Sequence, residues 1–124
     1  MKILIVDDTD LIRELIRDML ALLPFSATIE EAADVSQAMS ILSRWHPDVV
    51  TLDIQLPGGS GLDVLRAIKQ AGLSSTVIAL TSLTGRQIRQ ACLAAGASYF
   101  LEKSSDMEQL PAILRTIAEN RQNS

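Results

Sequence analysis

The chain has 124 residues, 48% of them hydrophobic and 21% charged, with a formal net charge of −4. This composition predicts a single compact domain and excludes a disordered segment, because enough apolar surface is available to form a core. Lys and Arg are not clustered along the sequence, which argues against direct nucleic-acid binding, since such binding depends on neutralising phosphates. The apolar runs are far shorter than a membrane span, so no membrane contact is expected.

Two further features concern the cellular compartment. The first residues lead directly into an apolar run, without the charged region and cleavage site of a secretory signal. The single cysteine, Cys92, allows no disulfide and no cysteine metal site within the chain. Together these features favour the cytoplasm. Cys92 lies on an apolar helical stripe and is expected in the core, whereas His46 is expected on the surface.

Short apolar runs alternate with segments of helical spacing along the whole chain. The runs predict strands at residues 3–6, 28–30, 49–52, 77–80 and 99–101. The first, third and fourth are continuously apolar, as buried parallel strands are. The helical segments carry five apolar stripes, which are Leu11, Leu15 and Met19 with Ile12 and Ile16 beside them; Val35, Met39 and Leu42; Leu62, Leu65 and Ile68; Ile88, Cys92 and Ala95; and Leu110, Ile113 and Ile117.

Capping residues fall between the two kinds of segment. Asp8 and Thr9 can cap the first helix, and Asp34 or a neighbour the second. Gly72 and Gly96 are placed to end the third and fourth helices. These positions set the element boundaries independently of the apolar pattern.

The last helix contains a conflict. Ser105 and Glu108 have the spacing of a capping box, which would start the helix early. Pro111 would then lie inside the helix, where it removes a hydrogen bond and clashes one turn back. We expect either a short separate turn before Pro111 or a helix whose regular part begins near it.

Five β-α units in succession predict an α/β fold, in which right-handed crossovers place helices on both faces of a parallel sheet. We expect one domain over residues 1–121, followed by a polar tail at 122–124, with no effector domain in the chain.

Polar residues follow four of the predicted strands. In open parallel sheets, ligands bind at the carboxyl ends of the strands. The residues expected at this edge are Asp7 and Asp8, Asp53, Thr81 and Ser82, and Lys103. Each alone has an ordinary explanation, such as a helix cap or a surface lysine. Chance rarely brings all of them to one edge of a sheet.

Three carboxylates at one edge call for a cation. Two carboxylates ~4 Å apart repel by ~4 kcal/mol at an effective dielectric constant of ~20. Magnesium fits this edge, because it takes a few carboxylate oxygens and keeps water or phosphate oxygens as its other ligands. A metal, a lysine and a hydroxyl are also the groups that stabilise a transferring phosphoryl group. An aspartate can accept that group as an aspartyl phosphate.

The order of these residues resembles the receiver domain of two-component response regulators. Residues 53–61, DIQLPGGSG, are similar to the loop after the family's acceptor aspartate, and Pro57, Gly58 and Gly61 belong to that loop. Ala95, Gly96 and Ala97 also match the family before the fifth strand. The resemblance covers essentially the whole chain. It implies a flavodoxin-like (βα)5 three-layer sandwich, with a five-stranded parallel sheet in the order 2-1-3-4-5.

The resemblance also implies the roles of the acidic residues. Asp53 would accept a phosphoryl group from a phosphohistidine on a sensor histidine kinase or a phosphotransfer protein. Asp8, supported by Asp7, would hold Mg²⁺, or Mn²⁺ in its place, together with Asp53 and the backbone carbonyl of Gln55. Such a module is a phosphorylation-dependent switch, which catalyses only its own phosphorylation and dephosphorylation.

Other residues match the family's switching machinery. Lys103 would pair with one phosphoryl oxygen, and the Thr81 hydroxyl, next to Ser82, would bond another. Phe100 matches the aromatic residue that turns inward when Thr81 is drawn toward the phosphate. Its neighbour Tyr99 should point to the opposite face of the sheet, because side chains alternate along a strand.

Phe100 departs from the family pattern in lacking a hydroxyl, which should alter partner contacts more than chemistry, and other departures concern the site itself. The residue after the lysine is often a proline with a cis peptide bond, but here it is Ser104. Either the site imposes a cis bond without proline, at a cost of ~3 kcal/mol, or Lys103 arrives by another path. Leu83, which like Gln55 flanks the acceptor, offers no hydrogen bond to an attacking water. This predicts a long-lived phosphorylated state.

Two other functions compete with the receiver hypothesis. The run at residues 5–10 has a faint similarity to phosphatases with an aspartate nucleophile, although the spacing differs and the chain is short for that family. A pseudo-receiver that binds partners without phosphorylation is the other alternative, and the complete set of site residues argues against it.

The output of the switch is open. The chain is either a stand-alone receiver or part of a longer regulator, and residues 100–106 are similar to receivers that precede helix-turn-helix domains. The expected partners are a downstream protein or an effector domain absent here, with a phosphorylation-dependent homodimer as a further assembly.

Overall fold

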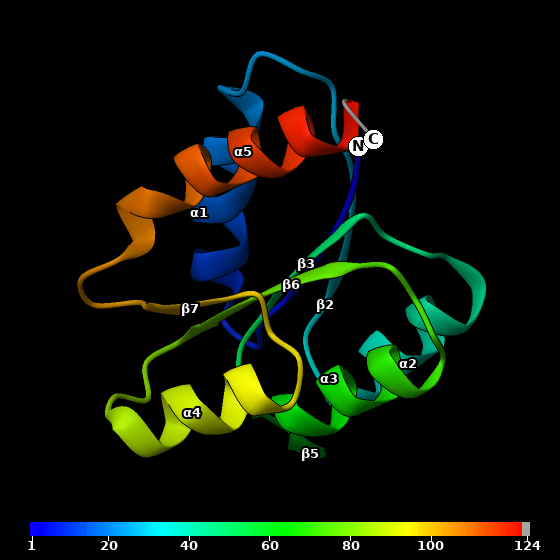
Figure 1. Cartoon of the computed structure of the whole chain (residues 1–124), viewed down its shortest axis with the longest axis vertical. Helices are drawn as coiled ribbons and strands as arrows, with labels where there is room; N and C mark the ends of the chain where they lie inside the picture. Colours follow the sequence, from blue (N-terminus) through cyan, green and yellow to red (C-terminus); the bar gives the residue numbers. More distant parts are fainter. Residues whose placement is uncertain (123–124) are drawn as a thin grey trace.

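Five parallel strands form the central sheet in the order β2-β1-β3-β6-β7 (Figure 1). The computed structural model describes residues 1–122 of the chain. The strands are β1 (Lys2–Val6), β2 (Thr28–Ala32), β3 (Val49–Leu52), β6 (Thr76–Thr81) and β7 (Tyr99–Glu102). This order corresponds to 2-1-3-4-5 of the flavodoxin-like fold and confirms the predicted α/β architecture. The predicted strands were each correct to within two residues at either end.

Helices cover both faces of this sheet. They are α1 (Asp10–Ala21), α2 (Val35–Arg44), α3 (Gly61–Gln70), α4 (Arg86–Ala94) and α5 (Leu110–Gln122). Side chains from α1 and α5 share one hydrophobic cluster, and side chains from α2, α3 and α4 share the other. Figure 1 shows α1 and α5 together on one side of the strands and the other three helices on the opposite side.

Strand alternation divides side chains between the two clusters. Phe100 is buried in the cluster with α2, α3 and α4, whereas Tyr99 packs against the cluster with α1 and α5. The predicted opposite orientation of these neighbours is therefore confirmed. Cys92 is buried in the same cluster as Phe100, and His46 is exposed, as predicted.

The apolar stripe predicted on the first helix divides in the structure. Ile16 is buried, and Ile12 and Met19 pack against the core beside it. Leu11 is 71% exposed and Leu15 is 42% exposed. The helix has more apolar positions than the face it turns to the sheet can bury, and these two residues lie outside that face.

Helix ends agree in part with the predicted caps. Asp34 accepts a hydrogen bond from the backbone nitrogen of Gln37, which confirms it as the cap of α2. Gly72 and Gly96 follow α3 and α4 with φ angles of 68° and 113°, the positive range that glycine adopts without strain. Thr9 takes the cap position of α1 without a side-chain cap hydrogen bond.

A small hairpin after β3 was not predicted. The two-residue strands β4 (Gln55–Leu56) and β5 (Gly59–Ser60) pair antiparallel around Gly58, whose φ angle is 83°. The hairpin leads into a reciprocal cap of α3. Ser60 Oγ accepts from the nitrogen of Leu62, and Asp63 Oδ2 accepts from the nitrogen of Ser60.

The conflict at Pro111 is resolved because a separate 3₁₀ turn precedes the α-helix. A 3₁₀ turn, η1 (Met107–Gln109), precedes α5, and Pro111 is the second residue of α5. Proline is tolerated in a first turn, because the backbone nitrogens there have no helical partner. The predicted capping box of Ser105 and Glu108 was wrong, since Ser105 Oγ donates to Asp106 Oδ1 instead. Of the predicted polar tail, Gln122 ends α5, and residues 123–124 lie outside the described residues.

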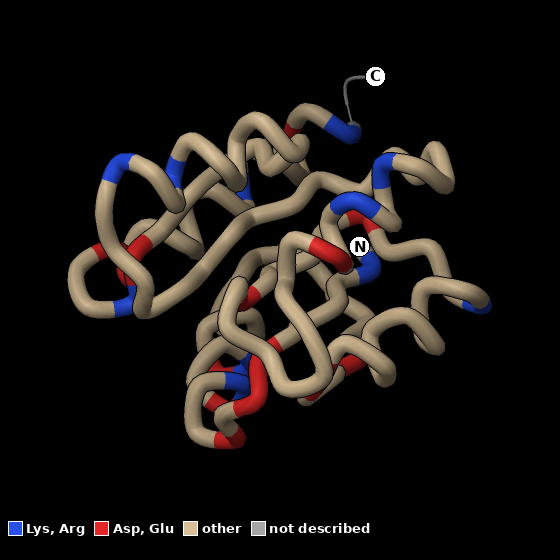
Figure 2. Tube along the Cα trace, turned by 90° about the horizontal axis from the view of Figure 1, so that it is seen from below, with Lys and Arg blue, Asp and Glu red and all other residues tan. Residues whose placement is uncertain are grey.

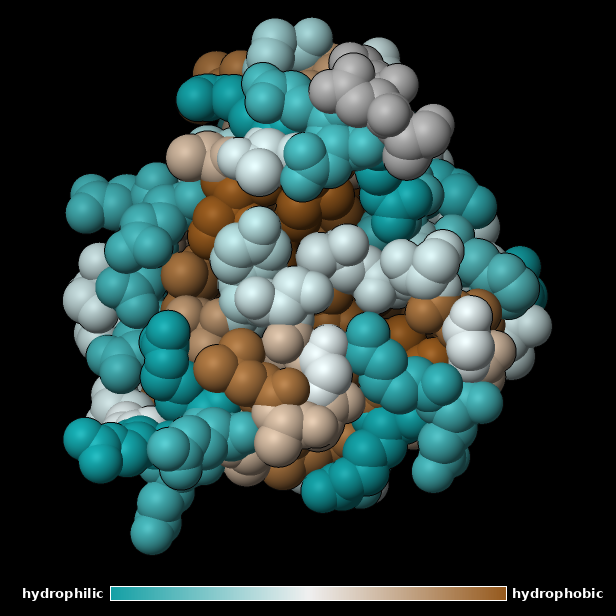
Figure 3. All heavy atoms as spheres, viewed as in Figure 1, coloured by the Kyte–Doolittle hydropathy of each residue, from teal (hydrophilic) through white to brown (hydrophobic). Residues whose placement is uncertain are grey.

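The face of the molecule drawn in Figure 3 has both hydrophilic and hydrophobic regions. Figure 3 shows hydrophilic side chains around the rim and hydrophobic atoms in the hollow beneath α5. Within the described residues, none of the helices is both long and apolar enough to cross a membrane.

Candidate functional site

Three aspartates meet at the carboxyl end of the sheet. Asp7 and Asp8 follow β1, and Asp53 follows β3, the neighbouring strand. Carboxylate oxygens of the three lie within 4.8 Å of one another. Asp7 and Asp53 are only 2% and 3% exposed, whereas Asp8 is exposed. The structure thus has two buried carboxylates with a third at the entrance.

The sheet itself places Asp7 and Asp53 side by side. The nitrogen of Asp7 donates to the carbonyl of Ala32 at 3.0 Å, and the nitrogen of Asp53 donates to the carbonyl of Val6 at 2.9 Å. Both residues therefore continue the hydrogen bonding of the strands by one position. The sheet therefore fixes the backbone positions from which the two side chains extend.

The two buried carboxylates are held in matching ways. Oδ1 of Asp7 accepts from the nitrogen of Thr9 at 2.8 Å, and Oδ1 of Asp53 accepts from the nitrogen of Gln55 at 3.0 Å. In each case the donor is the backbone two residues later, as in an Asx turn. Oδ2 of both residues faces Lys103, whose Nζ lies 2.5 Å from Asp7 and 2.7 Å from Asp53.

Lys103 directly follows β7, and its backbone is bonded to the neighbouring strand β6. Its nitrogen donates to the carbonyl of Thr81 at 2.9 Å. Every peptide bond in residues 1–122 is trans, including the one between Lys103 and Ser104, so the lysine reaches both aspartates by a trans path. Burial would lower the pKa of Lys103, but hydrogen bonds to Asp53 and Asp7 and the attraction of their charges together raise that pKa above its usual value.

The last residue of β6, Thr81, and the residues that follow it lie beside the acidic site. Thr81 is fully buried, and its Oγ1 accepts a hydrogen bond from the nitrogen of Leu83 at 3.3 Å. Ser82 is exposed, and its Oγ donates to Oε1 of Gln55 at 2.8 Å. The sequence placed Ser82 beside the phosphoryl site. In the structure its side chain joins the loop after β6 to the loop after Asp53.

Phe100 lies on β7, three residues before Lys103. It is buried in the cluster that contains Cys92, and the guanidinium of Arg89 lies 5.8 Å from its ring centroid. The ring therefore faces inward under α4. α4 begins after Gly85, which has a φ angle of 111° and provides no side-chain cap, so the start of the helix has few anchors.

The loop after Asp53 packs closely against the backbone of Asp53 and Ile54. The nitrogen of Gly61 donates to the carbonyl of Ile54 at 2.9 Å. A Cβ atom at Gly61 would collide with the backbone oxygen of Asp53 and come within 2.8 Å of Cα of Ile54. The carbonyl of Pro57 accepts from the nitrogen of Val35 at 3.2 Å, which ties the loop to α2. Only glycine fits at position 61.

The donor set suits a small, hard divalent cation. Such ions take carboxylate and carbonyl oxygens, and the three aspartates offer oxygens within 4.8 Å of one another. The exposed Asp8 provides a path from solvent, and the buried pair gains from the added positive charge. The residues present therefore fit Mg²⁺.

A comparison with known families shows the family to which this fold belongs. Residues 3–115 match the family model of the response regulator receiver domain. This chain belongs to that family. Members accept phosphoryl groups on an aspartate in two-component phosphorelays, interact with sensor kinases and phosphotransfer proteins, and bind Mg²⁺ at an acidic pocket.

Individual proteins show the same relationship. The nitrate/nitrite response regulator protein NarP of Escherichia coli K12 is 36% identical over 118 residues, which are 95% of this chain and 55% of NarP. A protein-glutamate methylesterase/protein-glutamine glutaminase of Treponema denticola is 33% identical over 120 residues, 95% of this chain and 32% of that protein. The signal receiver domain of a DNA-binding response regulator from Colwellia psychrerythraea 34H has a TM-score of 0.87 at 27% identity, covering 95% of this chain and 98% of that one.

The chain thus spans about half of NarP and about a third of the methylesterase. What the matched part shares with both relatives is the receiver domain, so the activity in the second relative's name is not carried over to this chain.

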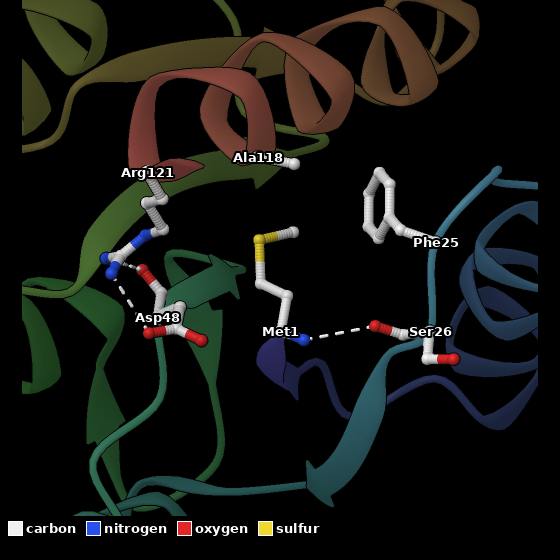
Figure 4. A pocket seen from close by; sticks show the side chains of 6 residues that line it. All are labelled: Met1, Phe25, Ser26, Asp48, Ala118 and Arg121. Carbon is white, nitrogen blue, oxygen red and sulfur yellow. Dashed lines mark hydrogen bonds and ion pairs between the residues drawn. The ribbon is translucent and has the colours of Figure 1, made fainter. Parts of the chain in front are cut away.

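The receiver domain has a second hollow at the other end of the sheet. A cavity of about 300 Å³ is lined by Met1, Phe25, Ser26, Asp48, Ala118 and Arg121 (Figure 4). Arg121 donates to the side chain of Asp48 at 3.0 Å and to its carbonyl at 2.8 Å. These residues tie α5 to the start of β3, which is a structural role at the end opposite the acidic site.

Sequence reasoning missed one residue beside the site, Arg13 in α1. Its Nη1 donates to the backbone carbonyl of Asp7 at 2.5 Å. The signal available in the sequence was a basic residue in the first turns of the helix that follows Asp7 and Asp8. That signal indicates a cation near the site but does not show which group the arginine contacts. Lys and Arg positions are spread over several elements in Figure 2, with Asp and Glu between them.

Proposed function

We propose that this receiver domain accepts a phosphoryl group on Asp53 from a phosphohistidine of a sensor kinase or phosphotransfer protein. The observation that carries the proposal is the bridge of Lys103 between the buried carboxylates of Asp53 and Asp7. A carboxylate oxygen of Asp53 attacks phosphorus, the P–N bond to the histidine breaks, and its electron pair returns to the imidazole. Lys103 remains positioned to pair with the oxygens of the bound phosphoryl group.

The cation site is part of the same proposal. Asp8, Asp7, Asp53 and the backbone carbonyl of Gln55 would hold Mg²⁺, or Mn²⁺ in its place. When bound, the ion supplies positive charge for the phosphoryl oxygens. Asp7 and Asp53 are already oriented by the backbone nitrogens of Thr9 and Gln55. Little rearrangement of these carboxylates is therefore needed for binding.

Switching would run through Thr81 and Phe100. The Thr81 hydroxyl accepts one long hydrogen bond, from the nitrogen of Leu83 at 3.3 Å, and its own O–H can donate to a phosphoryl oxygen. Movement of Thr81 would change the space above the buried ring of Phe100 and the start of α4. The domain would then have two conformations, which differ at Thr81, Phe100 and the start of α4. Phosphorylation shifts the balance between them only by the difference in its interaction free energy with the two conformations.

The residues flanking Asp53 favour slow hydrolysis. Leu83 offers an attacking water no hydrogen bond, and the Gln55 carboxamide oxygen accepts from Ser82. We propose that the phosphorylated state persists for minutes or longer. Phosphate release from the labelled protein measures this directly, and a lifetime of seconds would contradict it.

The wider role follows from this chemistry. The domain, residues 1–121, would act in the cytoplasm as a switch without turnover of an external substrate. Its output would be a downstream protein or an effector domain absent from this chain, with a phosphorylation-dependent homodimer as a further assembly. Direct contact with nucleic acid or a membrane is not part of the proposal.

The test is labelling with acetyl phosphate and Mg²⁺, followed by intact-mass analysis. The wild-type chain should gain one phosphoryl group and Asp53→Asn should gain none. Asp18→Asn, which changes an exposed aspartate on α1, should behave as the wild type. Labelling retained in Asp53→Asn and mapped to Asp7 or Asp8 would favour a phosphatase-like nucleophile instead. No label on the wild type would favour a pseudo-receiver.

A further inference from the structure

Arg13 makes contacts that join the acidic loop to two other elements. Its Nη1 donates to the backbone carbonyl of Asp7 at 2.5 Å, and its Nε donates to Oε1 of Glu31 on β2 at 3.1 Å. Its Nη2 forms an ion pair with Asp10 at the start of α1. The side chain is only 15% exposed. Three separate acceptors thus fix the guanidinium, whose planar fork is suited to this arrangement.

The bond to Asp7 acts on the peptide group that precedes Asp8. The carbonyl of Asp7 belongs to the peptide unit that leads to Asp8, and that unit is planar, so holding its oxygen restricts where Cα of Asp8 can lie. On the other side of Asp8, the nitrogen of Thr9 donates to Oδ1 of Asp7. Asp8 itself is exposed, and these two hydrogen bonds fix the backbone on either side of it.

We propose that Arg13 is a positioning residue for the cation site. It holds the backbone that carries Asp8, while its own side chain stays outside the cluster of cation-binding oxygens. The inference rests on the proposed function, because it assumes that Asp8 and its neighbours bind Mg²⁺. Groups that orient metal ligands in this indirect way commonly change metal affinity by 10–100-fold when they are removed.

Positioning and simple charge predict opposite results. Arg13 is a cation near the site, so removing its charge alone would make the acidic cluster more attractive to Mg²⁺. Removing its hydrogen bond to Asp7 would loosen the loop and weaken binding. The direction of the change in affinity therefore distinguishes the two effects.

The chain offers a matched control one turn further along α1. Arg17 donates to the two carboxylate oxygens of Glu31 at 2.6 Å and 2.5 Å. Among the described contacts it reaches neither Asp7 nor Asp10. Arg17 thus shares the charge, the helix and one acceptor with Arg13, but it lacks the bond to the acidic loop.

The experiment measures Mg²⁺ binding by calorimetry in the whole chain, without a phosphoryl donor. Arg13→Gln should bind Mg²⁺ about tenfold more weakly than the wild type. Arg17→Gln should stay within about twofold of it. The Mg²⁺ affinity of Arg13→Lys should lie between these two. An ammonium group can keep the hydrogen bond to the carbonyl of Asp7, but it cannot bond all three acceptors of the guanidinium in the same way. Should Arg13→Gln not fold, Arg13→Lys against Arg17→Gln provides the comparison.

A kinetic measurement separates positioning from a general loss of structure. With acetyl phosphate, the Mg²⁺ concentration for half-maximal labelling should rise about tenfold in Arg13→Gln. The rate at saturating Mg²⁺ should stay close to that of the wild type, because Asp53 and Lys103 are unchanged.

Two results would overturn the inference while leaving the proposed function intact. One is unchanged or tighter Mg²⁺ binding in Arg13→Gln. The other is an equal loss of affinity in Arg13→Gln and Arg17→Gln, which would mean that the Glu31 ion pairs only stabilise the fold. Absence of Mg²⁺ binding by the wild-type chain would overturn the cation site itself, and this inference with it.

Discussion

The ammonium nitrogen of Lys103 lies 2.7 Å from Oδ2 of Asp53, and the same nitrogen lies 2.5 Å from Oδ2 of Asp7. One cation thus joins two carboxylates that come from neighbouring strands and are both buried. Buried charges are costly unless they are paired. The arrangement makes Lys103 the counter-charge of the two buried carboxylates.

Replacing Lys103 should destabilise the chain when divalent ions are removed. Lys103→Met leaves two carboxylates close together without their shared partner, which should lower the free energy of unfolding by about 2 kcal/mol. Adding Mg²⁺ should raise the free energy of unfolding more in the variant than in the wild type, because the ion replaces the missing positive charge. Urea unfolding with EDTA and with Mg²⁺ measures both effects. Lys69→Met, at an exposed position on α3, is the control and should change little. Equal stability of Lys103→Met and wild type in EDTA would contradict this reading.

The raised pKa of Lys103 should appear in the pH dependence of stability. A group whose pKa is higher in the folded state stabilises the fold fully below its unfolded pKa, about 10.4 for lysine. That contribution is lost as pH rises through the higher folded pKa. The difference in unfolding free energy between wild type and Lys103→Met should therefore be constant from about pH 8 to 9 and shrink above about pH 10.4. Urea unfolding of both proteins across this range is the measurement. A difference that grows with pH would show that the shift has the opposite sign.

Gly61 should tolerate no side chain. In Gly61→Ala the new methyl group meets the backbone of Asp53 and Ile54, which cannot move without disturbing β3. We expect a loss of about 2 to 3 kcal/mol of stability together with slower phosphoryl labelling. Gly58→Ala is the comparison, because its Cβ would have open space around it but its φ angle is 83°. The cost there should be about 1 kcal/mol, with labelling unchanged. Similar labelling rates in the two variants would mean that position 61 does not support the acceptor.

One buried hydroxyl should be replaceable at a gain. Oγ1 of Thr51, in the middle of β3, is buried with no hydrogen-bond partner among the described residues. Thr51→Val keeps the shape and removes the unpaired polar group, so it should stabilise the chain by about 1 kcal/mol. Thr28→Val, at an exposed position of β2, should stay within about 0.5 kcal/mol of the wild type. Thermal unfolding of the three proteins measures the changes. Destabilisation by Thr51→Val would indicate that the hydroxyl has a partner after all.

The fold was predictable because its signals are local and repeated. Continuous apolar runs and helical stripes identified the five β-α units, and Asp34, Gly72 and Gly96 marked helix ends through hydrogen bonds and φ angles that depend on near neighbours. The hairpin of β4 and β5 was missed, because two-residue strands have no periodicity to detect. The exposure of Leu11 was missed for another reason. The apolar stripe of a helix does not show how wide a part of the helix surface the sheet covers, so residues at the edge of the stripe cannot be assigned to the core from the sequence.

The sequence by itself determined which residues reach the carboxyl edge of the sheet, since a residue that directly follows a buried strand must emerge there. Asp7, Asp53 and Lys103 were located in this way. Only the tertiary structure decided how they are paired. The bond from Lys103 to Asp53 joins residues 50 positions apart, and that from Arg13 to Glu31 joins residues 18 apart. Such contacts depend on strand order and on the reach of long side chains, and neither is set by neighbours along the chain.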